Sequence, residues 1–232
     1  MKIITLSFVC AWLKVSTTFA GETWQTALAQ MPLVTHVAEL DRSNCVALML
    51  GAFQSNAVVK ALIFMPGATD ELYFYRRASA KLTNADPSLL DAIVALTNQT
   101  YIRATFEAPL LLLHTSEDPT NVIAVVKDKS TAAKLRRKII PERIIFNDAG
   151  WDKVRATLGN SLNIGLRPFS NAPDSWHFYR HTFIACGVTE WELLEAVALA
   201  DKTRFTVHWL TADFQLDQRS GPVPDAKDIP PP

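Results

Sequence analysis

Short apolar segments divide the first third of the chain into strand-like and helix-like pieces. Residues 37–40 alternate as a strand does, residues 44–54 carry apolar side chains on one broad helical face, and residues 58–65 form a continuous apolar strand. Pro66-Gly67 ends that strand, and residues 72–77 have the aromatic composition of another strand. The pattern therefore predicts strand, helix, strand, turn and strand, in this order.

A comparable succession of elements is predicted three more times along the chain. The second unit has a helix beginning at Pro87, a returning strand at 101–106, and a hairpin of strands 110–114 and 122–126. The third unit has strand 143–146, helix 151–158 and strand 163–169, and strand 176–181 follows after a turn. The fourth unit has strand 183–186, a helix that runs from a Thr189 cap to Ala200, and strand 204–210.

Two stretches about a hundred residues apart resemble each other closely. Residues 68–77 read Ala-Thr-Asp-Glu-Leu-Tyr-Phe-Tyr-Arg-Arg, and residues 172–181 read Ala-Pro-Asp-Ser-Trp-His-Phe-Tyr-Arg-His. The chain on either side also repeats, since residues 95–103 match residues 198–206 in pattern. We therefore predict an α+β fold of internally duplicated β-α-β-β units, with helices packed on one face of mainly antiparallel sheets.

The start of the chain has the form of a secretory signal. Lys2 precedes an apolar run at 3–13, and Thr18-Phe-Ala20 provides a small-residue cleavage site, which predicts a signal peptide at 1–20. The run is too short to cross a bilayer, and no later stretch is long enough, so we expect no transmembrane segment in the mature chain. The remaining predicted units are a two-unit block at 21–126, a basic connector helix at 127–142, a second two-unit block at 143–217 and a disordered Pro-rich tail at 218–232.

The charge balance argues against a nucleic-acid partner. The chain has 23 Lys and Arg residues and 23 Asp and Glu residues, so no net charge attracts nucleic acid or an anionic membrane. Six residues between 127 and 138 are basic. Because the neighbouring chain is not basic, a solvated helix face explains them better than a nucleic-acid patch does.

Two cysteines follow the predicted cleavage site, Cys45 and Cys186. In an oxidising compartment they can form one disulfide, and two separate buried thiols are an equally good interpretation. No Cys-x-x-Cys pair occurs, which argues against a redox motif or a zinc finger. We expect no metal and no cofactor.

The repeated helical unit resembles a known family. Residues 87–102, Pro-Ser-Leu-Leu-Asp-Ala-Ile-Val-Ala-Leu-Thr-Asn-Gln-Thr-Tyr-Ile, and the similar residues 189–205 have a capped, leucine-rich helix and a polar exit before a strand. In this they resemble the secretin and TonB-receptor short N-terminal domain, across residues 37–126 and 143–216 as tandem units. The family's usual glycine after the exit threonine is replaced by Tyr101 or Arg204. The resemblance implies a periplasmic, non-enzymatic module that binds other proteins.

The two similar stretches also supply the candidate binding residues. Because alternate side chains of a strand share one face, each stretch presents an aromatic and basic stripe. The stripes are Tyr73, Tyr75 and Arg77 in the first copy and His177, Tyr179 and His181 in the second. Such stripes can stack on an anionic or glycan ligand, or bind the edge of a protein partner. A sheet face half covered by a helix is the other interpretation.

An enzyme is the alternative function. Residues 109–119 resemble the acid-loop strand of α/β-hydrolases, which would make Asp118 a triad acid, but the Gly-x-Ser-x-Gly nucleophile elbow is missing. On a strand, His177 and His181 would lie about 13 Å apart, too far to share a metal ion. This alternative is a secreted hydrolase or metal-dependent enzyme using His114, Asp118, His177 and His181.

Together these observations favour a binding protein over an enzyme. We expect an exported binding or assembly module of the bacterial envelope, periplasmic or secreted, that acts through aromatic-basic sheet faces or strand edges. Its partner would be a protein or a glycan or anionic ligand. Self-association through exposed strand edges is a further interpretation.

Overall fold

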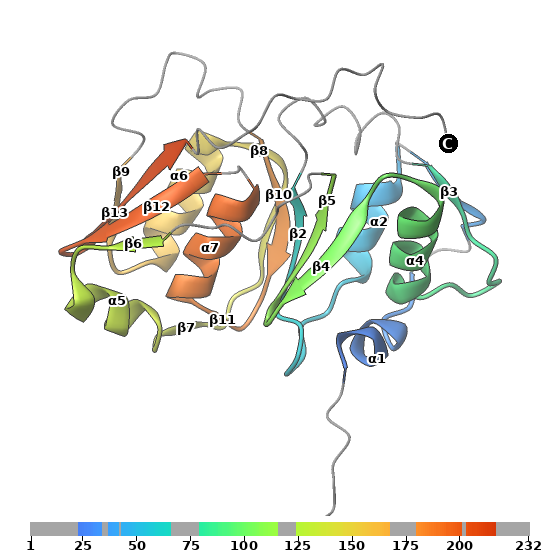
Figure 1. Ribbon diagram of the computed structural model, residues 1–232, viewed down its shortest axis with the longest axis horizontal. Helices are drawn as coiled ribbons and strands as arrows, with labels where there is room; N and C mark the ends of the chain where they lie inside the picture. Colours follow the sequence, from blue (N-terminus) through green and yellow to red (C-terminus); the bar gives the residue numbers. More distant parts are fainter. Residues whose placement is uncertain are drawn as a thin grey trace, which may run out of the picture.

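Helices and mainly antiparallel sheets make up the described part of the molecule (Figure 1). The computed structural model describes residues 23–33, 37–41, 43–65, 79–115, 124–167, 180–200 and 203–216. Six of the nine strand pairings within these ranges are antiparallel. The prediction of an α+β fold is therefore confirmed.

The described helices and strands are named in chain order. The helices are α1 (Trp24–Ala29), α2 (Cys45–Ala52), α4 (Leu89–Gln99), α5 (Lys129–Leu135), α6 (Trp151–Ser161) and α7 (Glu190–Ala200). The strands of the first half are β1 (Glu39–Leu40), β2 (Ala61–Met65), β3 (Ala80–Lys81), β4 (Arg103–Glu107), β5 (Leu110–His114) and β6 (Ala124–Val126). Those of the second half are β7 (Ile139–Ile140), β8 (Ile144–Gly150), β9 (Gly165–Arg167), β10 (Arg180–Ala185), β11 (Val188–Thr189), β12 (Thr203–His208) and β13 (Thr211–Leu216).

A five-stranded sheet contains strands from both halves of the chain. Its order is β4-β5-β2-β10-β8, and the halves join where Leu62 of β2 pairs with Ile184 of β10. Alternate side chains point to opposite faces, so Ile63 belongs to one hydrophobic core while Leu62 and Leu111 belong to the other. Every residue of β2 and β5 is buried, because both faces of the sheet are covered.

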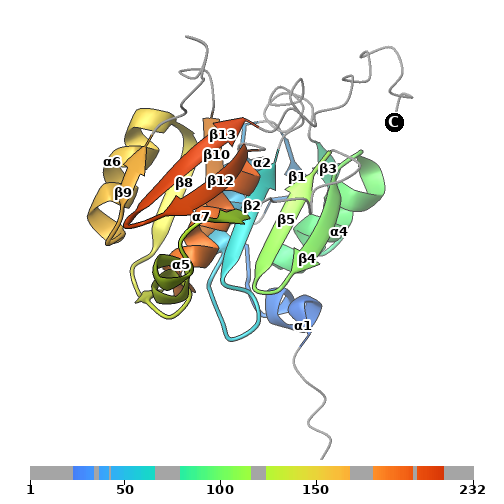
Figure 2. The same cartoon turned by 60° about the vertical axis from the view of Figure 1, so that its left-hand side comes forward.

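A four-stranded sheet forms a second layer, in the order β6-β12-β13-β9. Helices α6 and α7 lie between the two sheets, and α2 and α4 cover the other face of the five-stranded sheet (Figures 1 and 2). The four-stranded sheet thus has described helices on one face, as expected. The five-stranded sheet has them on both, because strands from the two halves bring a helix layer to each side.

Two strand predictions are wrong. Strands β5 and β6 do not form the expected hairpin: β5 pairs with β4 and β2, and β6 pairs with β12 in the other sheet. The fully apolar run Leu110–Leu113 belongs to the sheet interior, where it needs a partner on each side. In addition, β10 continues through Thr182, where the sequence predicted a break between two strands.

The two halves share a set of corresponding strand pairings. In the first half β1 pairs with β3, β4 forms a hairpin with β5, and β2 lies parallel to β5. In the second half β8 pairs with β10, β12 forms a hairpin with β13, and β9 lies parallel to β13. This correspondence agrees with a duplicated unit. The duplication and the block boundaries at 126 and 143 stay predictions, and the shared sheet means that the blocks are not packed independently.

Candidate functional site

One end of the five-stranded sheet gathers two histidines that the sequence indicated. Met65, at the end of β2, is in register with His114, at the end of β5. In the neighbouring pair, Arg180 and His181 at the start of β10 are in register with Gly150 and Ala149 at the end of β8. The fold thus brings His114 and His181 to the same end of one sheet, on two inner strands.

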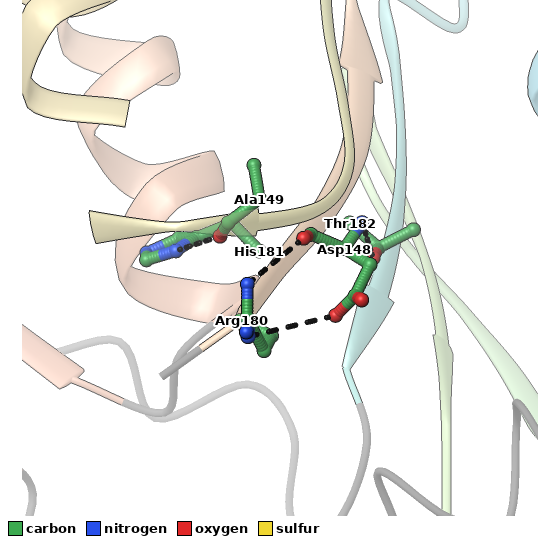
Figure 3. A network of polar contacts seen from close by, with 5 residues as sticks. All are labelled: Asp148, Ala149, Arg180, His181 and Thr182. Carbon is green, nitrogen blue, oxygen red and sulfur yellow. Dashed lines mark hydrogen bonds and ion pairs between the residues drawn. The ribbon is translucent and has the colours of Figure 1, made fainter. Parts of the chain in front are cut away.

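Strand β8 has a bulge at this end of the sheet (Figure 3). The pairing of β8 and β10 shifts register between His181 and Phe183, and Asp148 takes a left-handed φ of 49° there. The Asp148 N–H donates to the Thr182 hydroxyl at 3.0 Å, and Arg180 Nη1 donates to the Asp148 carbonyl at 3.4 Å. The Arg180–Asp148 ion pair itself is long, at 3.9 Å, and largely exposed, so it adds at most about 1 kcal/mol.

His181 lies inside the protein rather than on a binding face. Its side chain is fully buried, its ring centroid is 5.6 Å from that of Trp151, and Nδ1 is 3.4 Å from the Ala149 carbonyl oxygen. The prediction that His181 contacts a ligand is therefore corrected. The reason is that β10 is an inner strand, and the side chains of His181 and Phe183 enter the core beneath α6.

His114 is also buried and points away from His181. Its Nε2 lies 2.8 Å from the Thr105 hydroxyl of β4, whereas His181 bonds toward β8. Strand β2 separates the two histidine strands, which places them about 10 Å apart. This arrangement does not place both imidazoles on one metal ion. Within the ranges that the structure describes, no three His, Cys, Asp or Glu residues cluster as metal ligands.

The remaining predicted residues fall into two groups. Tyr73, Tyr75, Arg77, Asp118, His177 and Tyr179 lie outside the described residues. Cys45 and Cys186 are described, and both are free thiols, so the disulfide interpretation is not realised. Burial, with the negative Asp41 nearby, raises the pKa of the Cys45 thiol to about 12. Such a thiol stays protonated and unreactive.

The outer face of the four-stranded sheet is polar. No described helix lies against it (Figure 2). His208 of β12 and Asp213 of β13 form a pair at 2.9 Å between Nε2 and Oδ2, and Arg167 of β9 is in register with Asp213. Arg204 is exposed on the same face of β12. This face therefore combines cationic groups with a hydrogen-bonded histidine.

The turn between β12 and β13 presents an exposed indole. Trp209 and Leu210 form a two-residue turn, and 76% of the Trp209 surface is exposed. Leu210 has a left-handed φ of 54°, which is strained for a branched residue. Its N–H donates to the Thr131 hydroxyl at 3.2 Å, and its carbonyl accepts from the Gly165 N–H at 2.9 Å. The turn is thus held from beneath while its tryptophan faces outward.

A cavity of about 240 Å³ lies under this turn. It is bounded by α5, the residues after α6, the start of α7 and Leu210. Glu190 at its wall is buried, and its Oε1 accepts from Lys138 Nζ at 2.8 Å and from the Asn163 N–H at 3.1 Å. Lys134 also lines the cavity. The basic segment at 127–138 therefore supplies charge to a hollow beside Trp209.

The sequence did not single out Trp209, His208 or Asp213. A usable signal was present, because residues 203–208 and 211–216 alternate on either side of two residues, as the strands of a tight hairpin do. Trp209-Leu210 lacks the Asn-Gly or Asp-Gly composition that normally marks such a turn.

Comparison with known proteins found no matching family model, no matching curated protein and no matching solved structure. Across the described ranges, no helix has the length and apolar character that a bilayer crossing requires.

Proposed function

We propose that the protein is an exported, non-enzymatic binding module of the bacterial envelope, which engages a protein partner through the turn between β12 and β13 and the sheet face behind it. Export rests on the signal-like residues 1–20. The observation that carries the binding site is Trp209, 76% exposed on an anchored turn. An indole with 76% of its surface exposed contributes little to packing within the described residues.

The rigidity of the turn supports this proposal. Tryptophan is enriched among the few residues that dominate protein interfaces. Ordering a side chain or loop on binding weakens association, so a turn already fixed by Thr131 and Gly165 loses less free energy when a partner binds. The strained φ of Leu210 agrees with this, because strain persists where surrounding contacts hold it.

The neighbouring sheet face supplies the polar part of the interface. His208 lies beside the turn, and Arg167 and Arg204 lie farther along the same sheet face; all three side chains can hydrogen-bond or stack on a partner. The stripes predicted from the sequence lie elsewhere in the chain, at residues 73–77 and 177–181, and the face of β12, β13 and β9 is proposed as a separate binding surface.

Substituting the exposed indole tests the proposal. Trp209→Ala should reduce capture of a specific envelope protein at least about tenfold, measured by cross-linking in an envelope extract and mass spectrometry. Its melting temperature should stay close to that of the unsubstituted protein, because the side chain is mostly exposed.

Val94→Ala is the matched control, since Val94 is a 46% exposed apolar residue on α4 in the other half. It should leave capture unchanged. Retention of every captured protein by Trp209→Ala would contradict the proposal.

A further inference from the structure

The cavity beneath the turn has a charge that is not fully balanced. Glu190 is paired with Lys138, so one positive and one negative charge on the wall neutralise each other. Lys134 lines the same cavity and forms no ion pair within the described part of the chain. Lys134 acts electrostatically on Asp128, and that carboxylate is engaged in capping the start of α5. One ammonium group therefore remains for a ligand.

The rest of the wall is apolar and small. Leu135, Ile164 and Leu210 contribute aliphatic surface, and the volume of about 240 Å³ lies below the range of about 300–1,000 Å³ typical of drug-sized ligands. A hollow of this kind suits a single side chain: an aliphatic stem against the leucines and one negative charge at Lys134. Aspartate, glutamate and a chain-terminal carboxylate have this chemistry.

We propose that this cavity receives a carboxylate from an acidic segment of the protein partner, with Lys134 as the residue that binds it. The inference rests on the proposed function, because the partner would contact Trp209 at the same time. Charge complementarity favours this occupant: six residues at 127–138 are basic and one is acidic. A hydrogen bond to a charged group in a partly enclosed site also stabilises binding more than one at an open surface.

A pair of short peptides tests the inference on the full-length mature protein. The probes are acetyl-Leu-Glu-Leu-amide and the uncharged acetyl-Leu-Gln-Leu-amide, with affinity read from the NMR shifts of the Ile164 and Leu210 methyl groups. The glutamate peptide should bind at least about tenfold more tightly than the glutamine peptide.

Two variants separate the cavity from general charge attraction. Lys134→Gln should remove the preference for the glutamate peptide. Lys129→Gln, which makes the same charge change at the exposed first residue of the same helix, should preserve it. Glu190→Gln should strengthen binding of the glutamate peptide several-fold, because it leaves the Lys138 ammonium without its carboxylate partner.

Three outcomes would overturn the inference: equal binding of the two peptides, an equal loss in both lysine variants, or tighter binding of free 4-methylpentanoate than of the glutamate peptide. The last would show a site for a free acid. Partner capture by the Trp209→Ala variant tests the proposed function separately. If the peptide preference is absent but Trp209→Ala still loses its partner, only the cavity inference fails. If the preference is present but Trp209→Ala keeps every partner, only the proposed function fails.

Discussion

Helices α4 and α7 begin alike and lie in different surroundings. Each has 11 residues and starts with a capping box. Ser88 and Asp91 exchange hydrogen bonds at the start of α4, and Thr189 and Glu192 do so at the start of α7. Yet α4 buries one face, whereas nine of the 11 residues of α7 are buried. The same local signal therefore starts a surface helix in one half and an internal helix in the other.

The far ends of the two helices show the cause of this difference. The last two residues of α4, Asn98 and Gln99, are exposed, whereas the last two residues of α7, Leu199 and Ala200, are 5% and 3% exposed. Helix α7 contacts β2 and β10 on one side and β12 on the other. An apolar last turn is needed where two sheets enclose a helix, and a polar last turn where water reaches it.

The two sheets also differ, in how many of their faces are covered by described helices. The three strands β4, β5 and β2 belong to a sheet covered on both faces, while the matching strands β12, β13 and β9 keep one face without a described helix. Among the described residues, a sheet face with no helix against it is therefore found only in the second half. Units with similar strand pairing therefore differ in what covers them.

Exchanging residues between the last turns of the two helices should have the largest effect on stability. Leu199→Asn should lower the free energy of unfolding by about 3 kcal/mol or more, because it removes buried apolar contacts and encloses an amide. Asn98→Leu should change it by no more than about 0.5 kcal/mol, because that position is exposed. Urea unfolding of both variants measures the difference, and similar losses would break the comparison.

A smaller effect is expected from the pH dependence of Glu195, which is as far from the start of α7 as the exposed Val94 is from the start of α4. Burial raises the pKa of Glu195 above its ordinary value of 4.5, with a further rise from Glu192; the hydrogen bond from Trp191 and the charge of Arg136 oppose it. As the pH rises above 4.5, the unfolded chain releases this proton before the folded protein does. The contribution of Glu195 to stability is therefore complete below pH 4.5 and is lost as the pH passes the raised value.

Glu195→Gln should accordingly reduce the fall in the free energy of unfolding between pH 4 and pH 7. Urea titrations at several pH values measure it, with Glu142→Gln on an exposed loop as the control. A steeper fall in the free energy of unfolding in Glu195→Gln than in the unsubstituted protein would contradict a raised pKa of Glu195.

The local elements could be predicted because their signals lie in short stretches of sequence. The Thr189 and Glu192 spacing predicted the start of α7, and the apolar run before Pro66 predicted β2. Strand partners could not be predicted in the same way. Pairing of β6 with β12, or of β2 with β10, depends on contacts between distant segments, which a local apolar pattern does not encode.

The candidate site was harder to predict for a related reason. Chemistry-bearing residues drew attention in the sequence, but His114 and His181 turned out to be packed inside the core. Burial of a histidine depends on whether its strand is at the edge or the centre of a sheet. The exposed Trp209 carried no motif, and an aromatic residue within a strand-rich segment normally indicates core.

The sheet that β2 and β10 build together joins the two halves of the protein. Hydrogen exchange measured by mass spectrometry at increasing urea tests it directly. Because the halves share this sheet and its two cores, peptides from β2, α4, β10 and α7 should lose protection with the same urea dependence, in one cooperative step. Loss of protection in residues 89–114 at clearly lower urea than in residues 180–214 would contradict the shared sheet as the unit that holds the protein together.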